Sequence, residues 1–172
     1  MSSALRVTPP AKQHGDPIRD SALGLVPETL AAYIPLSRAV WLNGPLSPAL
    51  LEMVRLRNAR KVNCVFCKST RYDIARDAGL NEEKVALIQD GYEDSDLSRR
   101  EKLLLAYTDQ YLDNSAGMSD ALRAELAAEF SAEELVHLSL GLLLFNTFSR
   151  FAVAMGGMPD SVPIMEMSLP AA

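Results

Sequence analysis

The sequence predicts an all-α fold of six to eight helices joined by short connections, and three observations lead to this class. Hydrophobic residues make up 48% of the 172 residues and aromatic residues only 6%, so we expect a core of Leu, Ala, Val and Ile. Helix-capping signals recur along the chain. No segment shows the alternation of polar and apolar residues that is typical of a strand.

In the first third of the chain, prolines mark where helices begin. Pro27 suits the first turn of one helix, and a second short helix is predicted to begin near Pro35. Ser47 followed by Pro48 forms a cap and first-turn pair that opens the stretch "PALLEMVRLRNAR". That helix is too apolar to lie on a surface, so we expect it inside the fold.

The remaining helices are predicted from capping and stop signals. One helix begins near Cys64, runs through "VFCKSTRYDIARDAG" and ends at Gly79. The N-terminal caps of the later helices are Asn81, Ser98 with Glu101, Ser119 or Asp120, and Ser131 with Glu134. The last helix contains the apolar segment 135–155, which polar residues interrupt, leaving a run too short to span a bilayer. We interpret it as a buried core helix.

The domain organisation follows from proline and glycine outside this helical region. Residues 1–20 are predicted to form a flexible N-terminal arm, residues 21–157 one helical domain, and residues 158–172 a C-terminal tail. Met165 and Met167 in the tail are alternatively expected to pack on a neighbouring subunit.

Charge excludes some classes of function. The net charge of −5 argues against a nucleic-acid-binding protein and against a protein that binds anionic membranes. The segment 52–76 nevertheless holds seven basic residues against two acidic ones, and it contains both cysteines. The N-terminus lacks an apolar run of signal-peptide length, so we expect a reducing, cytoplasmic location.

The two cysteines, Cys64 and Cys67, are the strongest functional signal. Their spacing places them one helical turn apart, where a disulfide can form and open again. Cys64 lies at the predicted start of a helix, where free amides favour a thiolate. Arg71, four residues after Cys67, would share its helical face and could stabilise a thiolate or pair with a carboxylate, but it cannot shuttle protons.

Other interpretations of these residues stay open. A metal site would need ligands beyond the two cysteines, and the chain offers only His14 and His137, unless subunits share the site. The cysteines could also be inert core residues. Glu52, in an apolar helix, is either functional or paired with a structural arginine. We interpret His137 as a core or interface residue.

Asn146 and Arg150 lie four residues apart in the last helix, on one helical face. They line a cavity or a subunit contact, or they form a local cap or ion pair. Trp41 and Tyr72 are most simply packing residues.

The arrangement Glu52, eleven residues, Cys64, two residues, Cys67, followed by "ARDAGL", resembles the AhpD-like alkylhydroperoxidases of the carboxymuconolactone decarboxylase superfamily. The likeness extends from the helix at Ser47 to about Ile88, and more loosely to "FNTFSRFA". It implies that Cys67 attacks the peroxide, that Cys64 resolves the sulfenic acid, and that Glu52 is the base of a proton relay. The helix-end argument favours Cys64 as the attacking thiol instead.

The sequence departs from the family pattern at Arg71, where the family has a histidine. A histidine relays protons near neutral pH and an arginine does not. In a substitute scheme, Arg71 pairs with Glu52 and stabilises the Cys67 thiolate, and water relays protons. Phe66 also stands where some members carry a further histidine.

The leading hypothesis is therefore a cytoplasmic thiol oxidoreductase that reduces hydroperoxides through a Cys64–Cys67 dithiol–disulfide cycle, without a metal or bound cofactor. The resemblance also implies a homo-oligomer, trimer or hexamer, and a thiol electron donor such as a lipoylated protein. No nucleic acid or membrane partner is expected. The alternatives are a scaffold protein that lost turnover with the histidine, and a lactone decarboxylase-like enzyme that would not need the cysteines.

Overall fold

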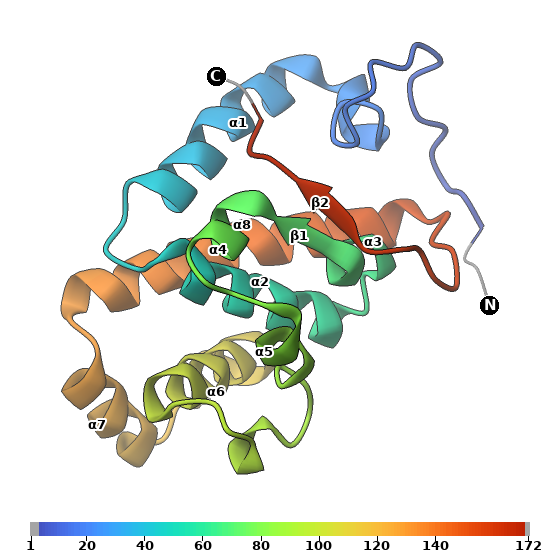
Figure 1. Ribbon diagram of the computed structural model, residues 1–172. Helices are drawn as coiled ribbons and strands as arrows, with labels where there is room; N and C mark the ends of the chain where they lie inside the picture. Colours follow the sequence, from blue (N-terminus) through green and yellow to red (C-terminus); the bar gives the residue numbers. More distant parts are fainter. Residues whose placement is uncertain (1–3, 171–172) are drawn as a thin grey trace.

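The computed structural model describes residues 4–170 of the chain, and these residues form helices apart from two three-residue strands and the connections (Figure 1). The all-α class is confirmed, with eight α-helices among the described residues. The helices are α1 (Pro27–Leu42), α2 (Pro48–Val62), α3 (Val65–Ser69), α4 (Asp73–Asp77), α5 (Glu82–Ala86), α6 (Arg99–Asn114), α7 (Asp120–Glu129) and α8 (Ala132–Met155). Two 3₁₀ turns (Ala22–Leu25 and Tyr92–Asp94) and the strands β1 (Thr70–Tyr72) and β2 (Met165–Met167) complete the elements.

The predicted helix caps are confirmed. Asn81 and Ser119 each accept a hydrogen bond from a first-turn amide of the helix that follows. The capping boxes of Ser98 with Glu101 and of Ser131 with Glu134 are both complete, with reciprocal side-chain and backbone bonds. These local signals were readable because a cap depends on residues only three positions apart.

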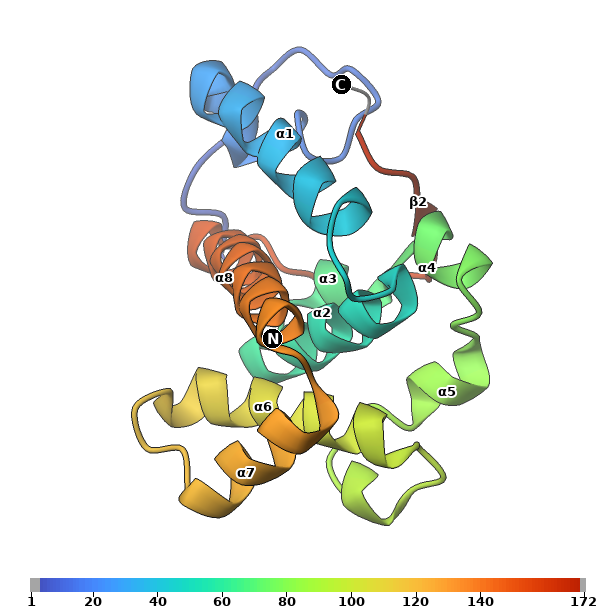
Figure 2. The ribbon, with the colours of Figure 1, turned by 90° about the vertical axis from the view of Figure 1, so that its left-hand side faces the viewer.

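Helix α2 is the centre of the molecule, as its apolar sequence predicted. It begins after the Ser47 cap, whose hydroxyl accepts from the Leu50 amide. Every residue from Leu51 to Ala59 is buried, because α8 lies beside α2 and α6 lies beneath it (Figure 2). Burying a leucine side chain contributes about 1.5–3 kcal/mol, so this packing fixes α2 firmly and, with it, the polar side chains that α2 carries into the core.

The prediction of two short helices around Pro35 is wrong, because α1 continues through this proline. Proline removes one helical hydrogen bond and leaves the carbonyl of residue i−4, here Ala31, without its partner. Both Pro35 and Ala31 are exposed, so water can satisfy that carbonyl. Packing also holds α1 together: the rings of Tyr33 and Phe148 lie 3.9 Å apart, joining α1 to α8.

The predicted helix over residues 64–79 is also wrong. It is divided into α3, β1 and α4. Strand β1 pairs in parallel with β2 from the C-terminal tail, with Thr70 opposite Met165 and Tyr72 opposite Met167. The two tail methionines therefore lie in a strand that pairs with a strand of their own chain. Neither strand was predicted, because three residues are too few to show a strand pattern.

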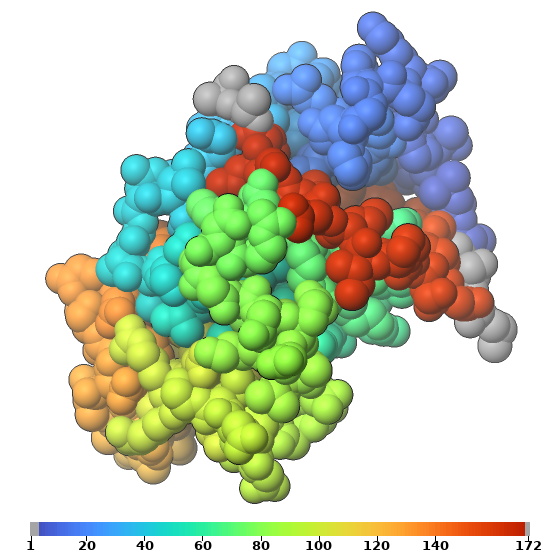
Figure 3. All heavy atoms as spheres, in the orientation of Figure 1, coloured from blue at the N-terminus to red at the C-terminus, as the bar shows by residue number. Residues whose placement is uncertain are grey.

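Side-chain contacts hold the C-terminal tail on the surface. Arg76 pairs with Glu166, and Ser168 donates to Asp73. The space-filling view shows the tail running between the N-terminal segment and the region of β1 and α4 (Figure 3). Residues 1–3 of the predicted arm and residues 171–172 of the tail lie outside the described residues.

Helix α8 is buried on one face only, which corrects the prediction of a wholly buried helix. Leu138 and Leu142 pack into the core. On the opposite face Val136, Leu140 and Leu143 are 60%, 49% and 56% exposed. Among the described helices, α8 alone is long and apolar enough to cross a membrane, since the polar residues that interrupt it are mostly uncharged. Core helices of soluble proteins meet the same criteria.

Candidate active site

The two cysteines lie where α2 gives way to α3. Asn63 ends α2 in the left-handed conformation (φ 58°, ψ 40°), which turns the chain sharply. Cys64 is the N-terminal cap of α3, and its sulfur accepts a hydrogen bond from the Cys67 amide at 3.2 Å. The two residues are joined by a disulfide, with Cα atoms 5.2 Å apart. Cys64 is fully buried and Cys67 partly exposed, so Cys67 is the member of the pair that solvent reaches.

An arginine from α2 explains why the helix ends soon after Cys67. In a continued helix the Cys67 carbonyl would accept from the amide of Arg71. Instead the Nη1 of Arg55 donates to this carbonyl at 2.8 Å, and its Nη2 donates to the Thr70 carbonyl at 2.7 Å. The Thr70 hydroxyl donates to the Phe66 carbonyl at 2.9 Å. With these carbonyls occupied, the chain leaves the helix and forms β1.

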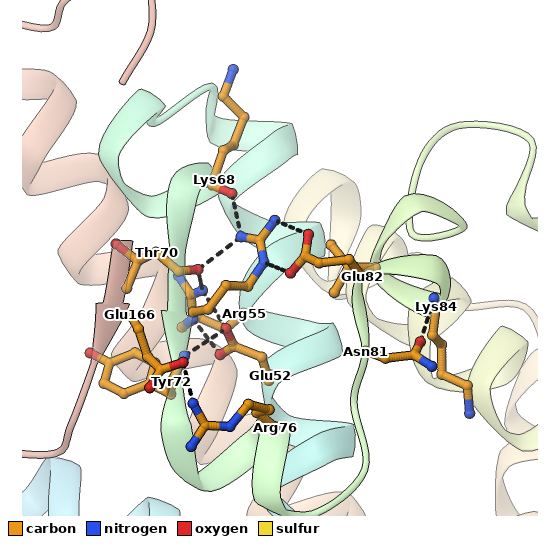
Figure 4. A network of polar contacts seen from close by, with 12 residues as sticks. Glu52, Arg55, Lys68, Thr70, Tyr72, Arg76, Asn81, Glu82, Lys84 and Glu166 are labelled. Carbon is orange, nitrogen blue, oxygen red and sulfur yellow. Dashed lines mark hydrogen bonds and ion pairs between the residues drawn. The ribbon is translucent and has the colours of Figure 1, made fainter. Parts of the chain in front are cut away.

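Glu52 is buried and bound by the same arginine (Figure 4). Its two carboxylate oxygens accept from Nε and Nη2 of Arg55, both at 2.6 Å, and the Tyr72 amide approaches one of them at 3.4 Å. Burial by itself would lower the pKa of Arg55, but the charge and hydrogen bonds of Glu52 raise it above its ordinary value. Arg55 therefore stays a cation inside the fold.

The expected pairing of Arg71 with Glu52 is wrong. The Nε and Nη2 of Arg71 bind the carboxylate of Glu82, at 2.6 and 3.1 Å, and its Nη1 donates to the Lys68 and Thr70 carbonyls. The expectation failed because it assumed that Cys67 and Arg71 lie on one helix, whereas Arg71 lies in β1. The two arginines nevertheless meet at the Thr70 carbonyl, which accepts from both.

Arg55 is the residue that the sequence reasoning missed as part of the site. The available signal was its spacing, three residues after Glu52 on a helix predicted to be buried. The contact between Arg55 and Glu52 agrees with the second interpretation of Glu52 given above, in which it pairs with a structural arginine. The structure therefore brings Glu52 into contact with the segment that follows Cys67 through Arg55 and not through Arg71.

His137 lies in the core, as expected. Its Nδ1 accepts from the Leu46 amide at 3.3 Å, so the ring proton is on Nε2, which donates to the Val40 carbonyl at 2.8 Å. Both nitrogens thus join α8 to its neighbours, one to the end of α1 and the other to the α1–α2 connection.

Asn146 and Arg150 belong to a chain of polar contacts between α8 and α2. Asn146 donates to the fully buried Asn58 at 2.8 Å, and Arg150 donates to Asn146 at 3.0 Å. Asn58 in turn donates to the hydroxyl of Ser149 at 3.0 Å. His14 lies in the exposed N-terminal segment. Among residues 4–170, no three His, Cys, Asp or Glu side chains are grouped as a metal site would require.

Trp41 and Tyr72 pack together, with ring centroids 4.9 Å apart, and Trp41 also contacts Phe145 at 5.4 Å. Burial raises the pKa of the Tyr72 hydroxyl above its ordinary value. The Tyr72 ring also lies beside the Glu52–Arg55 pair, since the Arg55 guanidinium carbon is 5.4 Å from its ring centre.

Comparison with known proteins agrees with the motif. The profile of the carboxymuconolactone decarboxylase family matches residues 27–92, which include both cysteines and Glu52. The uncharacterized protein Rv2313c of Mycobacterium tuberculosis is 33% identical over 111 residues, covering 64% of this chain and 39% of the relative. The chain thus spans well under half the length of this relative.

Solved structures share the fold. A protein of unknown function from Agrobacterium tumefaciens, ATU0492, is 24% identical, with a TM-score of 0.67 over 88% of this chain and 95% of its own. An uncharacterized peroxidase-related protein from Ralstonia eutropha, described as an alkylhydroperoxidase AhpD core, is 20% identical, with a TM-score of 0.67 over 80% of this chain and 73% of its own. At these identities the similarity establishes the architecture.

Proposed function

Because this chain is a member of the carboxymuconolactone decarboxylase superfamily with an AhpD-like fold, we propose that it is a thiol-dependent oxidoreductase that reduces hydroperoxides through Cys64 and Cys67. The observation that supports this most strongly is the disulfide between a buried and a partly exposed cysteine at the start of α3. One accessible sulfur beside one protected sulfur suits a cycle in which the first meets the substrate and the second closes the disulfide.

In this proposal the Cys67 thiolate attacks one oxygen of the hydroperoxide. The O–O bond breaks, the alkoxide leaves and takes up a proton to become an alcohol, and Cys67 becomes a sulfenic acid. The Cys64 thiol then attacks the Cys67 sulfur and displaces water. The sum is one hydroperoxide and two thiols giving one alcohol, one water and one disulfide. Partial exposure of Cys67 favours this order over attack by the buried Cys64.

A dithiol donor would return the site to its reduced form. Its thiolate attacks the accessible Cys67 sulfur, Cys64 leaves as a thiolate, and the second thiol of the donor releases Cys67 with formation of the donor's disulfide. The Cys67 amide that donates to the Cys64 sulfur at 3.2 Å would stabilise this leaving thiolate. A lipoylated protein in the cytoplasm has the required dithiol chemistry.

In this scheme Glu52 is not the base of a proton relay. Both of its oxygens are directed at Arg55, so we propose that water carries the proton at Cys67 and that Glu52 acts by holding Arg55. No metal or bound cofactor enters any step.

The proposal is tested by mass spectrometry of alkylated thiols in the reduced native protein, before and after brief exposure to a small excess of hydroperoxide at neutral pH. We expect the Cys64–Cys67 disulfide to form within seconds and to open again with a dithiol. If both thiols stay reduced, peroxide reduction by this cysteine pair is excluded, and the scaffold function becomes the better description.

We further propose that the exposed face of α8 binds a second copy of the chain. Residues 135–149 contain no Asp, Glu, Lys or Arg, so two such faces could meet without burying a charge. Val136, Leu140 and Leu143 recur at helical spacing and, with Tyr111, line a shallow groove between α8 and α6. A self-complementary apolar stripe of this kind suits a symmetric interface between identical subunits.

Leu140→Lys is expected to convert the oligomer to a monomer, because the interface would then have to bury an unpaired ammonium group. Light scattering coupled to size-exclusion chromatography measures the change in mass. Val54→Ala is the matched control, since it truncates a fully buried side chain of α2 and should leave the mass unchanged. A wild-type protein that is already monomeric, or a Leu140→Lys variant with the wild-type mass, would contradict this interface.

A further inference from the structure

Arg55 has contacts that a purely structural ion pair does not need. Its side chain is buried, and it donates twice to Glu52, once to the Cys67 carbonyl and once to the Thr70 carbonyl. The guanidinium thus joins a carboxylate on α2 to the backbone of Cys67, the partly exposed cysteine. Figure 4 shows Arg55 beside Glu52 and Thr70.

We infer that Arg55 is a positioning residue for the disulfide: it fixes the Cys67 end of α3 and supplies the positive charge that favours the Cys67 thiolate, while Glu52 moderates that charge. The inference rests on the proposed function of the two cysteines. It assigns the control of the Cys67 thiol pKa to Glu52 and Arg55 on α2. The family resemblance had implied that Glu52 is the base of a proton relay instead.

The other cations near this segment do not bind the Cys67 backbone. Lys68 donates to the side chain of Asn63 at 2.7 Å. Arg71 pairs with Glu82 on α5 and donates to the Lys68 and Thr70 carbonyls, and it shares the Thr70 carbonyl with Arg55. Among these cations, Arg55 alone donates to the carbonyl of Cys67. Because the pair with Glu52 is buried, water screens its charges little. Removing Glu52 would therefore leave a net positive charge beside Cys67, and removing Arg55 would leave a net negative charge there.

Because the two charges have opposite signs, the two variants distinguish an effect on the pKa of the Cys67 thiol from an effect on stability alone. Glu52→Gln leaves the Arg55 cation uncompensated, which favours the thiolate. Arg55→Gln leaves the Glu52 anion uncompensated and removes the hydrogen bond to the Cys67 carbonyl, which disfavours the thiolate. Both variants lose stability, but a structural role alone would not move the thiol chemistry in opposite directions.

The chain offers a matched control on the same helix. Arg57 is also buried and binds a carboxylate through two hydrogen bonds, to Asp109 of α6 at 2.7 and 2.6 Å. It contacts Asp90 and the Tyr92 ring rather than the cysteine segment. Arg57→Gln and Asp109→Asn therefore each remove a partly buried ion pair from α2 without touching the backbone of Cys67.

The experiment measures two properties of the reduced and oxidised protein. The pH dependence of Cys67 alkylation gives the pKa of its thiol, and equilibration with a dithiol–disulfide buffer gives the reduction potential. We expect Glu52→Gln to lower the Cys67 pKa by about one unit and Arg55→Gln to raise it by a similar amount. The disulfide should become easier to reduce in the first variant and harder in the second. The Arg57 and Asp109 variants should leave both properties at wild-type values.

The double variant Glu52→Gln/Arg55→Gln buries no charge and keeps the test open if Arg55→Gln does not fold. We expect its Cys67 pKa to exceed the wild-type value, because the donor to the Cys67 carbonyl is lost. Shifts of the same sign in the two single variants, shifts no larger than those of the controls, or a wild-type pKa in the double variant would overturn the inference. None of these readouts requires peroxide turnover, so a wild-type protein that is inert to peroxide would reject the proposed function alone.

Discussion

Cys67→Ser is expected to reduce the rate of hydroperoxide consumption to the uncatalysed background, whereas Cys64→Ser is expected to keep the first step and lose the cycle. Cys67 is the partly exposed cysteine of the pair and the proposed nucleophile, so its replacement removes the attacking thiol. In Cys64→Ser the sulfenic acid forms at Cys67 but has no partner thiol. Steady-state peroxide consumption with a dithiol donor measures turnover, and trapping with a cyclic diketone measures the sulfenic acid, which should reach one per chain in Cys64→Ser.

Serine at position 64 is a favourable control because the fold should tolerate it. Cys64 caps α3 by accepting from the Cys67 amide, and a serine hydroxyl caps in the same way. Sulfenic acid trapped in Cys67→Ser but not in Cys64→Ser would reverse the order of attack and support the helix-end argument. Unchanged activity in both variants would point instead to chemistry that does not use the cysteines, such as that of a lactone decarboxylase.

The sequence predicted the fold class and the helix caps because these depend on local patterns. It failed at Pro35 and over residues 64–79, where tertiary contacts decide the outcome. The proline in α1 is tolerated because Ala31, whose carbonyl loses its helical partner, is exposed to water. In the cysteine segment, a side chain twelve residues upstream of Cys67 takes its carbonyl and ends the helix. Helix propensity depends on neighbouring residues in the sequence and therefore does not predict such a tertiary contact.

The candidate site was predicted in part for the same reason. Spacing and family resemblance pointed to Glu52 and the two cysteines as candidates, and the separation of the cysteines allowed the disulfide that the structure contains. The partner of Glu52 could not be chosen in the same way, because the choice between Arg55 and Arg71 depended on whether residues 64–79 formed one helix. Once β1 replaces the second part of that helix, Arg71 binds Glu82 and Arg55 remains for Glu52.

Gly44→Ala is expected to lower the free energy of unfolding by about 3 kcal/mol. A Cβ atom at Gly44 would overlap the imidazole of His137. Moving the ring would break its bonds to Val40 and Leu46, which join α8 to the end of α1 and the connection before α2. The Gly44 backbone does not have the positive φ that requires glycine, so the penalty arises from the clash alone. Urea unfolding followed by circular dichroism measures it.

A double-mutant cycle distinguishes this contact from a general sensitivity of the loop. His137→Ala alone should cost about 2 kcal/mol, because the Leu46 amide and the Val40 carbonyl lose their partner. In Gly44→Ala/His137→Ala the new methyl group meets no ring, so the two costs should not add, and the double variant should be about as stable as His137→Ala. Costs that add to within about 0.5 kcal/mol would show that alanine at position 44 destabilises the loop for another reason. If the cycle behaves as expected, His137 is a structural residue whose space Gly44 provides, and the peroxide reactivity of the thiols should survive its removal at temperatures where the variant stays folded.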